Sequence, residues 1–304
     1  MNMNIYYNET YNAPDIEFET FEKSRYIADA VNKLVFDGTT HSLRIKDPSE
    51  VGGALQNADR LMRNHLTPEY YRAVLIGEPR SLAASNDLGW NRGVYDSVLN
   101  STAGIICAID EVLGEAEQSC SLSSGLHHAR PNTGAFFCTV NSLAIGALYA
   151  SSMAKRTVVL DLDAHFGGGT YVYAKSASHP FGIVDMSISD LDSYDPHPSI
   201  GIAIKANKNN YESQLSDMLD ILEAERPEIV LYNAGVDVYP TLTAEQVVAR
   251  ELRVARKIRE IGAKAVVVMA GGYGEYENII PLHLSTILAF AEPEMLESGL
   301  VVSR

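Results

Sequence analysis

The sequence of 304 residues has little cysteine, few basic residues and no long apolar run. Its three cysteines, Cys107, Cys120 and Cys138, indicate a reducing compartment rather than a disulfide framework, so we expect a cytoplasmic protein. The 24 Lys and Arg are outnumbered by 39 Asp and Glu, and the net charge of −15 argues against binding to nucleic acid. Because the chain has no apolar run of about 18 residues and no signal-peptide pattern, we expect no contact with a membrane.

The rest of the composition is typical of a folded α/β protein. Hydrophobic residues make up 46% of the sequence, and no Pro-rich or Ser-rich linker divides it. Strand and helix patterns alternate over at least the second half, which favours a central, mainly parallel β-sheet with helices on both faces. We therefore predict one domain over residues 1–304. Predicted strands are 3–7, 72–76, 181–188, 200–204, 228–234 and 265–270, and predicted helices are 21–36, 51–66, 92–113, 138–153, 211–224, 243–261 and 282–291.

One further predicted strand opens the segment TVVLDLDAHFGGGT, residues 157–170. Asp161, Asp163 and His165 follow its apolar run, and residues two apart on a strand point to the same side. Open α/β sheets bind ligands at the carboxyl ends of their strands. A carboxylate beside an imidazole suits a divalent metal, zinc above all. The alternative is a charged strand end that turns into solvent.

Polar residues follow three other predicted turns, namely the pair His127-His128, then Asp237, then Tyr273. Each has a structural alternative: a turn or a buried pair for the histidines, a helix cap for Asp237 and a packed aromatic for Tyr273. The exits of parallel strands lie on one edge of a sheet, so the joint occurrence predicts that these side chains converge on one site.

The converging groups have the chemistry of a zinc hydrolase. Catalytic zinc takes three protein ligands and keeps a position for water, which Asp163, His165 and Asp237 would allow. Hydrolysis then needs a base, an acid and a group that polarises the carbonyl. The two histidines can serve as base and acid, and the Tyr273 hydroxyl can polarise the carbonyl. Asp161 would fix the tautomer of a histidine.

Five segments carry a resemblance to a known family. They are Ser124-Gly-Leu-His-His-Ala-Arg130, Phe137-Cys-Thr-Val-Asn141, Leu160-Asp-Leu-Asp-Ala-His165, Asn233-Ala-Gly-Val-Asp237 and Ala270-Gly-Gly-Tyr273. In this order they resemble the histone deacetylase superfamily, which includes acetylpolyamine amidohydrolases and bacterial deacetylase-like enzymes. The resemblance extends from about residue 25 to about residue 291. It implies an arginase-like α/β fold, one zinc ion per chain and a structural potassium ion.

The resemblance also implies roles for individual residues. The implied zinc ligands are Asp163, His165 and Asp237. The implied catalytic residues are His127, His128, Tyr273 and Asp161, with Asp161 behind His127. The implied monovalent-cation site consists of Asp161, Leu162, Asp163, His165 and Ser187. The implied substrate-binding residues are Phe136, Phe137, Tyr194, His197 and Gly272, with Phe137 as one wall of an acyl-lysine tunnel. Arg25 falls where the family often has an arginine in an internal cavity.

The sequence departs from the family pattern at three places. Gly168 replaces the aspartate that usually pairs with the second histidine, so we expect His128 to lack a charged partner and to have a lowered pKa. The family's Asp-Pro-Leu-Gly segment is missing after Asp237. The second tunnel wall falls in the 189–199 loop, where His197 or Tyr194 could line the mouth.

The leading hypothesis is a zinc-dependent deacylase that removes an acyl group, acetyl above all, from an amine. Its substrate would be an acyl-lysine, an acetylpolyamine or a small metabolite, and three aspartates of the 189–199 loop (Asp190, Asp192 and Asp195) favour a cationic amine. The alternatives are a metal-binding sensor without hydrolytic activity, which Gly168 motivates, and a ureohydrolase with two manganese ions. The sequence leaves open whether the chain forms a homo-oligomer.

Overall fold

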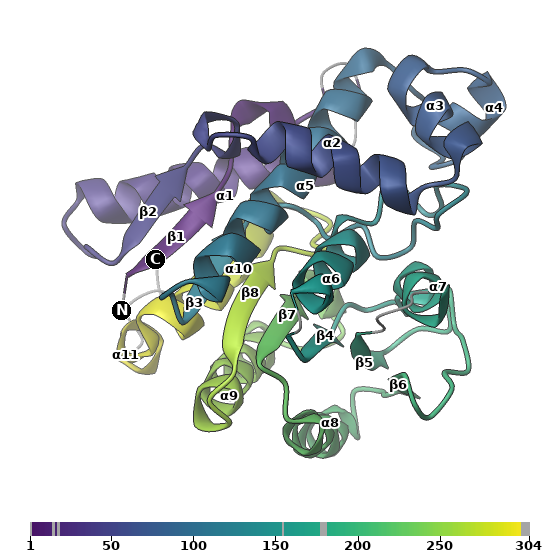
Figure 1. The fold of residues 1–304 in the computed structure, drawn as a ribbon. Helices are drawn as coiled ribbons and strands as arrows, with labels where there is room; N and C mark the ends of the chain where they lie inside the picture. Colours follow the sequence, from purple (N-terminus) through teal and green to yellow (C-terminus); the bar gives the residue numbers. More distant parts are fainter. Residues whose placement is uncertain (1, 14–15, 17–18, 154, 177–180, 299–304) are drawn as a thin grey trace.

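The computed structural model describes residues 2–13, 16, 19–153, 155–176 and 181–298, and its centre is a β-sheet (Figure 1). In this part of the chain the strand order is β2-β1-β3-β8-β7-β4-β5-β6, and all neighbouring strands are parallel. The strands are β1 (Met3–Tyr6), β2 (Leu43–Lys46), β3 (Gln118–Ser121), β4 (Thr157–Asp161), β5 (Gly182–Ser187), β6 (Gly201–Lys205), β7 (Ile229–Asn233) and β8 (Lys264–Val268).

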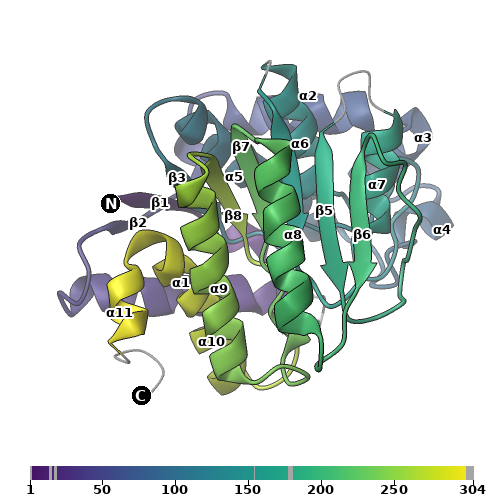
Figure 2. The same ribbon diagram turned by 90° about the horizontal axis from the view of Figure 1, so that it is seen from below.

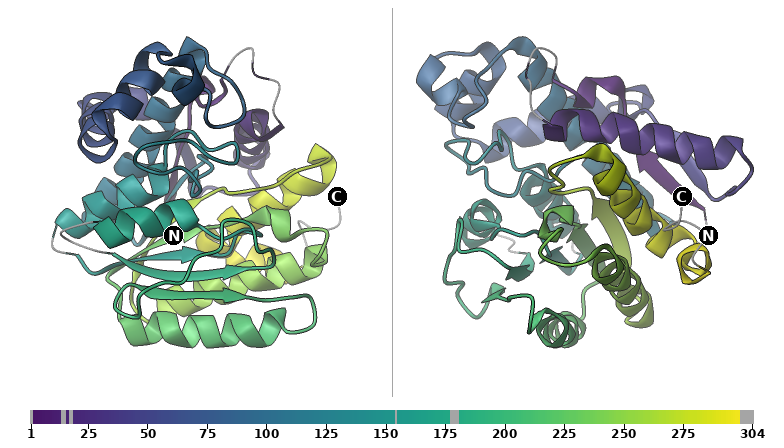
Figure 3. Two further views of the ribbon diagram at one scale, coloured as in Figure 1. Left: turned by 90° about the vertical axis from the view of Figure 1, so that its right-hand side faces the viewer. Right: turned by 180° about the vertical axis from the view of Figure 1, so that it is seen from behind.

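Helices cover both faces of this sheet. Those that pack on one face include α1, α8, α9 and α10, and those on the other include α2, α5, α6 and α7 (Figures 1 and 2). Figure 3 shows α1 beside α10, although these helices are far apart in the sequence. The helices are α1 (Glu19–Phe36), α2 (Ala54–His65), α3 (Pro68–Ile76), α4 (Arg80–Ala83), α5 (Arg92–Leu113), α6 (Ser142–Ser152), α7 (Gly168–Ser176), α8 (Tyr211–Glu225), α9 (Ala244–Glu260), α10 (Tyr276–Ala291) and α11 (Pro293–Glu297), with 3-10 turns η1 (Glu9–Tyr11), η2 (Pro48–Glu50) and η3 (Val236–Val238).

The sheet separates two hydrophobic cores. Successive residues of a strand point to opposite faces, so β4 sends Val158 and Leu160 into one core and Val159 into the other. Every residue of β4 and β7 is buried. Such strands have no face left for polar residues, which is why they read as continuous apolar runs in the sequence. The predicted fold class, an α/β fold with a parallel sheet and helices on both faces, is confirmed.

Most predicted elements lie where the apolar pattern is strong, and the errors have local causes. The bounds predicted for α5 are those of the structure. The predicted strand at 72–76 is wrong, because these residues are the end of α3. This helix begins at Pro68, after Thr67 accepts a hydrogen bond from the Tyr70 amide at 3.3 Å. Proline is compatible with the first turn of a helix, so Thr67-Pro68 ends one helix and starts another.

Short or polar elements escaped prediction. Strand β3 has the sequence Gln118-Ser-Cys-Ser121, yet all of its residues are buried. Strand β2 has only four residues, and α7 starts in the glycines that follow His165. None of the helices in the described ranges is long and apolar enough to cross a membrane. The single domain over residues 1–304 stays a prediction.

Candidate metal centre

Four neighbouring strands of the sheet, β3, β8, β7 and β4, lead to the predicted site residues. The chain after β3 carries His127 and His128, and the chain after β8 carries Tyr273. Asp237 follows β7, and the segment 162–165 follows β4, which ends at Asp161. Because the strands are parallel and adjacent, these four exits lie next to each other at one edge of the sheet.

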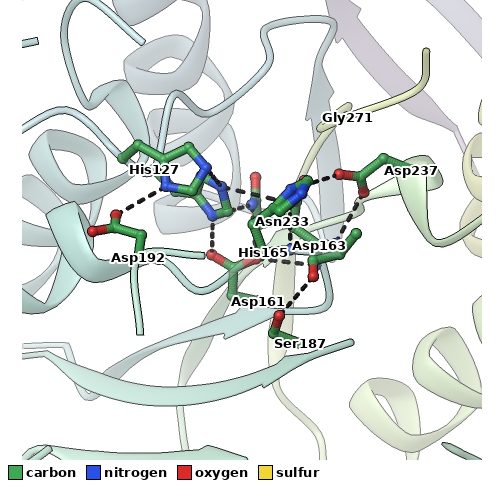
Figure 4. Close-up of polar contacts among 12 residues, drawn as sticks. His127, Asp161, Asp163, His165, Ser187, Asp192, Asn233, Asp237 and Gly271 are labelled. Atoms are coloured by element: carbon green, nitrogen blue, oxygen red, sulfur yellow. Dashed lines mark hydrogen bonds and ion pairs between the residues drawn. The ribbon is translucent and has the colours of Figure 1, made fainter. Parts of the chain in front are cut away.

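Asp163, His165 and Asp237 meet at this edge (Figure 4). Each offers one ligand atom, and these atoms all lie within 4.8 Å of one another. The Nδ1 atom of His165 is 3.3 Å from Oδ1 of Asp163 and 3.2 Å from Oδ2 of Asp237. The backbone amides of His165 and Ala164 donate to Asp163 Oδ1 and Asp237 Oδ1, both at 3.0 Å. The amides therefore fix the directions of the two carboxylates.

The charges around these three residues match a divalent cation. Burial, together with the charge of Asp163, raises the pKa of Asp237 to about 6. Burial also opposes the charge on Asp163, but the nearby histidines His127 and His165 hold its pKa well below the usual range. Oδ2 of Asp237 is buried and accepts no hydrogen bond. Two buried carboxylates and an imidazole with an unused oxygen fit zinc, which binds oxygen and nitrogen ligands of this kind.

The loops that carry the ligands are braced from behind by a completely buried arginine, Arg250 of α9. Its Nη1 donates to the Leu162 carbonyl at 3.0 Å, and its Nη2 donates to the Gly235 carbonyl at 2.9 Å. Its charge is compensated by Glu251, whose Oε1 accepts from Nε at 2.8 Å. A Cβ atom at Gly235 would lie 2.3 Å from Cα of Asp163, so only glycine lets the two loops approach this closely.

The two histidines face each other, with Nε2 atoms 3.1 Å apart. Nδ1 of His127 donates to Oδ2 of Asp161 at 2.8 Å, and the amide of Asn233 donates to the other oxygen at 2.8 Å. Burial alone would lower the pKa of His127, but the charges of Asp161 and Asp163 raise it to about 10. Burial and the charge of His127 lower the pKa of His128. Two lone pairs at this distance would repel, so one proton between the Nε2 atoms is favoured and the pair titrates as a unit.

The expectation that His128 lacks a charged partner is wrong. Its Nδ1 lies 2.9 Å from Oδ2 of Asp192, a residue of the loop between β5 and β6 (Figure 4). The lowered pKa of His128 has burial as its first cause, and not a missing carboxylate. The sequence drew attention to Asp192 only as one of three acids in this loop. Nothing in its local pattern connects it to a histidine 64 residues away.

A small cavity opens over the metal-ligand residues. Both histidines, two phenylalanines and the tyrosine line this cavity. The full set of lining residues is Lys23, Ser124, Leu126, His127, His128, Phe136, Phe137, Cys138, Asp163, His165, Gly271 and Tyr273. The side chains at its rim stay accessible, with Tyr273 44% and Phe137 43% exposed. Burial and the charges of Asp163 and Asp237 raise the pKa of Tyr273, so its phenol is protonated at neutral pH.

The rim has a strained backbone. Phe136 has φ 46° and Phe137 has φ 66°, both in the left-handed region that bulky residues avoid. The loop is held there because Phe137 donates its amide to the Asn86 carbonyl at 3.0 Å. The ring of Phe136 lies edge-on to His128 with centroids 5.2 Å apart. Strain of this kind is often found at ligand-binding sites.

Three residues assigned to substrate binding lie outside this cavity. Tyr194 points inward instead, where its hydroxyl donates to Asp185 at 2.8 Å. His197 is exposed and pairs with Ser199 at 2.7 Å. At Gly272 a Cβ would meet His283, and it is the preceding glycine that lines the cavity. The structure therefore does not bring Tyr194, His197 or Gly272 into this cavity, and their part in substrate binding stays a prediction.

The buried cation near the cavity is Lys23, not Arg25. Arg25 is 41% exposed in its side chain, whereas Lys23 is completely buried and donates to the Gly271 carbonyl. Burial lowers the pKa of Lys23 to about 8. A signal for Lys23 exists in the sequence, since Lys23, Ile27 and Val31 follow at intervals of four on one helix face.

The implied monovalent-cation site is matched only in part. The Leu162 carbonyl accepts from the Arg250 guanidinium at 3.0 Å, and a carbonyl that faces a positive group is a poor ligand for potassium. The Ser187 hydroxyl donates to the Ala164 carbonyl at 2.6 Å. Leu162 does not fit the implied set, and no step of the chemistry below passes through potassium.

Comparison with known proteins agrees with this geometry. Residues 49–188 match the histone deacetylase domain family. An uncharacterized protein of Picosynechococcus sp. is 28% identical over 228 residues, which covers 68% of this chain and 73% of that protein. The histone deacetylase clr6 of Schizosaccharomyces pombe is 28% identical over 162 residues, 48% of this chain and 40% of its own. The acetoin utilization protein AcuC of Staphylococcus aureus is 45% identical over 58 residues, 19% of this chain and 15% of its own.

The last two matches span less than half of those relatives, so they show kinship and not a shared substrate. The domain match, the relatives and the parallel sheet agree with one another. The domain match covers less than half of the chain, and over residues 49–188 the chain is similar to the histone deacetylase domain family.

Proposed function

We propose that this protein is a zinc-dependent deacylase that hydrolyses the linear amide of an acylated amine, with acetyl as the preferred acyl group. The observation that carries the proposal is the meeting of Asp163, His165 and Asp237 beneath a cavity that also contains a histidine pair and a tyrosine. The similarity of residues 49–188 to the histone deacetylase domain family supports the same reaction class.

The three ligand residues would hold one zinc ion, and zinc in such a set acts as a Lewis acid that polarises a carbonyl and lowers the pKa of water. Asp163 and Asp237 lie buried, with their carboxylates aimed by backbone amides. A pre-aimed set of this kind loses little conformational entropy when it binds metal.

The histidine pair moves the protons of the reaction. With one proton between the two Nε2 atoms, the pair has one basic and one acidic nitrogen facing the cavity. One member accepts a proton from the attacking water, and the other donates a proton to the departing amine. Asp161 holds His127 by Nδ1, which keeps Nε2 directed at the reacting atoms.

Tyr273 stabilises the charge that develops on the carbonyl oxygen. Its raised pKa keeps the hydroxyl protonated, so it donates a hydrogen bond to an oxyanion. Phe136 and Phe137 at the mouth suit the flat amide and the alkyl chain of an acyl-lysine or an acylated polyamine. The net charge of −15 favours a substrate that carries a positive charge away from the amide.

The alternatives are less well supported. The sensor hypothesis was motivated by a missing partner for His128, and Asp192 occupies that role. A ureohydrolase needs two metal ions, whereas the described residues contain one group of three candidate ligands.

The test is hydrolysis of acetyl-lysine and trifluoroacetyl-lysine reporters and of acetylated polyamines. We expect turnover that stops when a chelator removes the metal and returns when zinc is added. Stoichiometric zinc without turnover on the whole panel contradicts the proposal and supports the sensor.

A further inference from the structure

We infer that Asp192 is a positioning residue for His128, and that Gly168 is glycine because the carboxylate and the backbone carbonyl of Asp192 fill the space of its side chain. The inference rests on the proposed function, since it assigns Asp192 a part in the proton transfers of the histidine pair.

The Asp192 carboxylate is held in the site by two partners. One oxygen, Oδ2, is 2.9 Å from Nδ1 of His128. The other oxygen, Oδ1, accepts a hydrogen bond from Nη2 of Arg130, whose Nη1 also donates to the His128 carbonyl at 3.0 Å. The side chain of Asp192 is only 4% exposed. A buried carboxylate with two charge-capable donors is held firmly in one orientation.

This arrangement mirrors the neighbouring pair. Asp161 binds Nδ1 of His127 at 2.8 Å, just as Asp192 binds Nδ1 of His128 at 2.9 Å. Each carboxylate fixes its histidine with Nδ1 protonated, so the two Nε2 atoms face each other and the cavity. The difference is one of origin, since Asp161 ends a buried strand whereas Asp192 lies on a loop.

The loop adopts an unusual backbone to deliver Asp192. The residue has φ 58°, in the left-handed region that aspartate tolerates better than most residues. The loop around it is held by the amide of Phe166, which donates to the Leu191 carbonyl at 3.1 Å. A strained, fixed residue in contact with a site histidine points to a functional requirement.

Gly168 is the steric counterpart of Asp192. A Cβ at Gly168 would lie 2.5 Å from Oδ1 of Asp192 and 2.6 Å from both its Cγ and its backbone carbonyl oxygen, far inside contact distance. Gly168 itself is not in the left-handed region, so it is the lack of space that requires glycine. A side chain at position 168 would therefore enter the volume that the carboxylate and the carbonyl of Asp192 occupy.

The first test separates charge from shape. Asp192→Asn keeps the size and tolerates the backbone, and we expect it to lower kcat by roughly 10²-fold, within the usual contribution of general acid–base catalysis. KM and zinc content should stay near those of the wild type. The matched control is Asp190→Asn in the same loop, whose side chain is 77% exposed and pairs only with Lys205 in the described contacts. A kcat of Asp192→Asn equal to that of the control overturns the inference.

The second test fills the space at position 168. Gly168→Ala places a Cβ against the Asp192 carboxylate, so we expect it to lower kcat as Asp192→Asn does. In the double variant Gly168→Ala/Asp192→Asn the charged contact with His128 is already lost, so we expect a kcat within about threefold of that of Asp192→Asn alone. Losses in kcat that multiply in the double variant overturn the inference.

A third readout does not depend on turnover. The Nδ1–H proton of His128 should give a strongly downfield NMR signal in the zinc-loaded wild type, assigned by its loss in His128→Gln. This signal should move or vanish in Asp192→Asn and stay unchanged in the control Asp190→Asn. If the wild type hydrolyses no reporter, the proposed function fails. The NMR signal still shows whether Asp192 binds Nδ1 of His128. A signal that Asp192→Asn leaves unchanged overturns the inference.

Discussion

The floor and the rim of the cavity are held by different forces. The floor, made by Asp163, Asp237 and their flanking residues, is buried and cross-linked by amides and by the guanidinium of Arg250. The rim, made by Phe136 and Phe137, is 38–43% exposed and lies on a loop. Rigid strand ends suit the fixed geometry of a metal, whereas loops suit the choice of substrate. We therefore expect floor variants to change chemistry and rim variants to change specificity.

The largest effect should come from the floor. His165→Ala removes a ligand, so zinc binding should fall by more than the roughly 10–100-fold that loss of an outer partner costs. Activity should be lost together with the metal. The matched control is His197→Ala, because His197 is exposed and lies outside the cavity lining. Zinc content by atomic absorption checks this, and stoichiometric zinc in His165→Ala would show that the ligands are misassigned.

The second-largest effect should come from Arg250, which holds the loops behind the floor. Arg250→Met leaves Glu251 buried without a counter-charge and two carbonyls without a donor, which should cost about 3–5 kcal/mol of folding stability. Zinc should also bind more weakly, because the loops before the ligands are released. Chemical denaturation and zinc titration measure the two effects. The double variant Arg250→Met/Glu251→Gln should recover part of the stability, and no recovery would argue against charge as the cause.

Tyr273→Phe tests the point where rim and floor meet. We expect kcat to fall about 10²–10³-fold with KM and zinc content nearly unchanged, because the hydroxyl acts on the transition state. Steady-state kinetics on an acetyl-lysine reporter, with metal analysis of the same sample, is the measurement. An unchanged kcat removes Tyr273 from the mechanism.

The smallest effect should come from the rim alone. Phe137→Ala removes apolar contact with the substrate and should raise KM by about tenfold or less, with kcat and zinc content retained. Comparing acyl-lysine with acetylpolyamine shows whether the loss depends on the amine. A large fall in the zinc content of Phe137→Ala would contradict the expectation that rim residues do not affect metal binding.

The sequence predicts the floor of the cavity much better than it predicts the contact between His128 and Asp192. Asp163 and His165 are two apart at the end of an apolar strand, so a local pattern is enough to place them together. To predict that Asp237 and the histidines lie beside them, it was enough to know that parallel strands end at one edge of the sheet. Asp192 escaped because its place depends on one left-handed residue in an irregular loop, which no periodicity encodes. Tyr194 and His197 belong to the same loop, so the sequence did not show that their side chains lie outside the cavity.

The proposed function depends on one zinc ion held by Asp163 and His165, which follow β4, and by Asp237, which follows β7. A crystal of the zinc-loaded protein, measured at the zinc absorption edge, locates this ion. We expect one anomalous peak per chain at about 2.0–2.2 Å from oxygens of Asp163 and Asp237 and from Nδ1 of His165. A peak elsewhere, or one that Asp237 does not contact, would show that the metal site is misassigned.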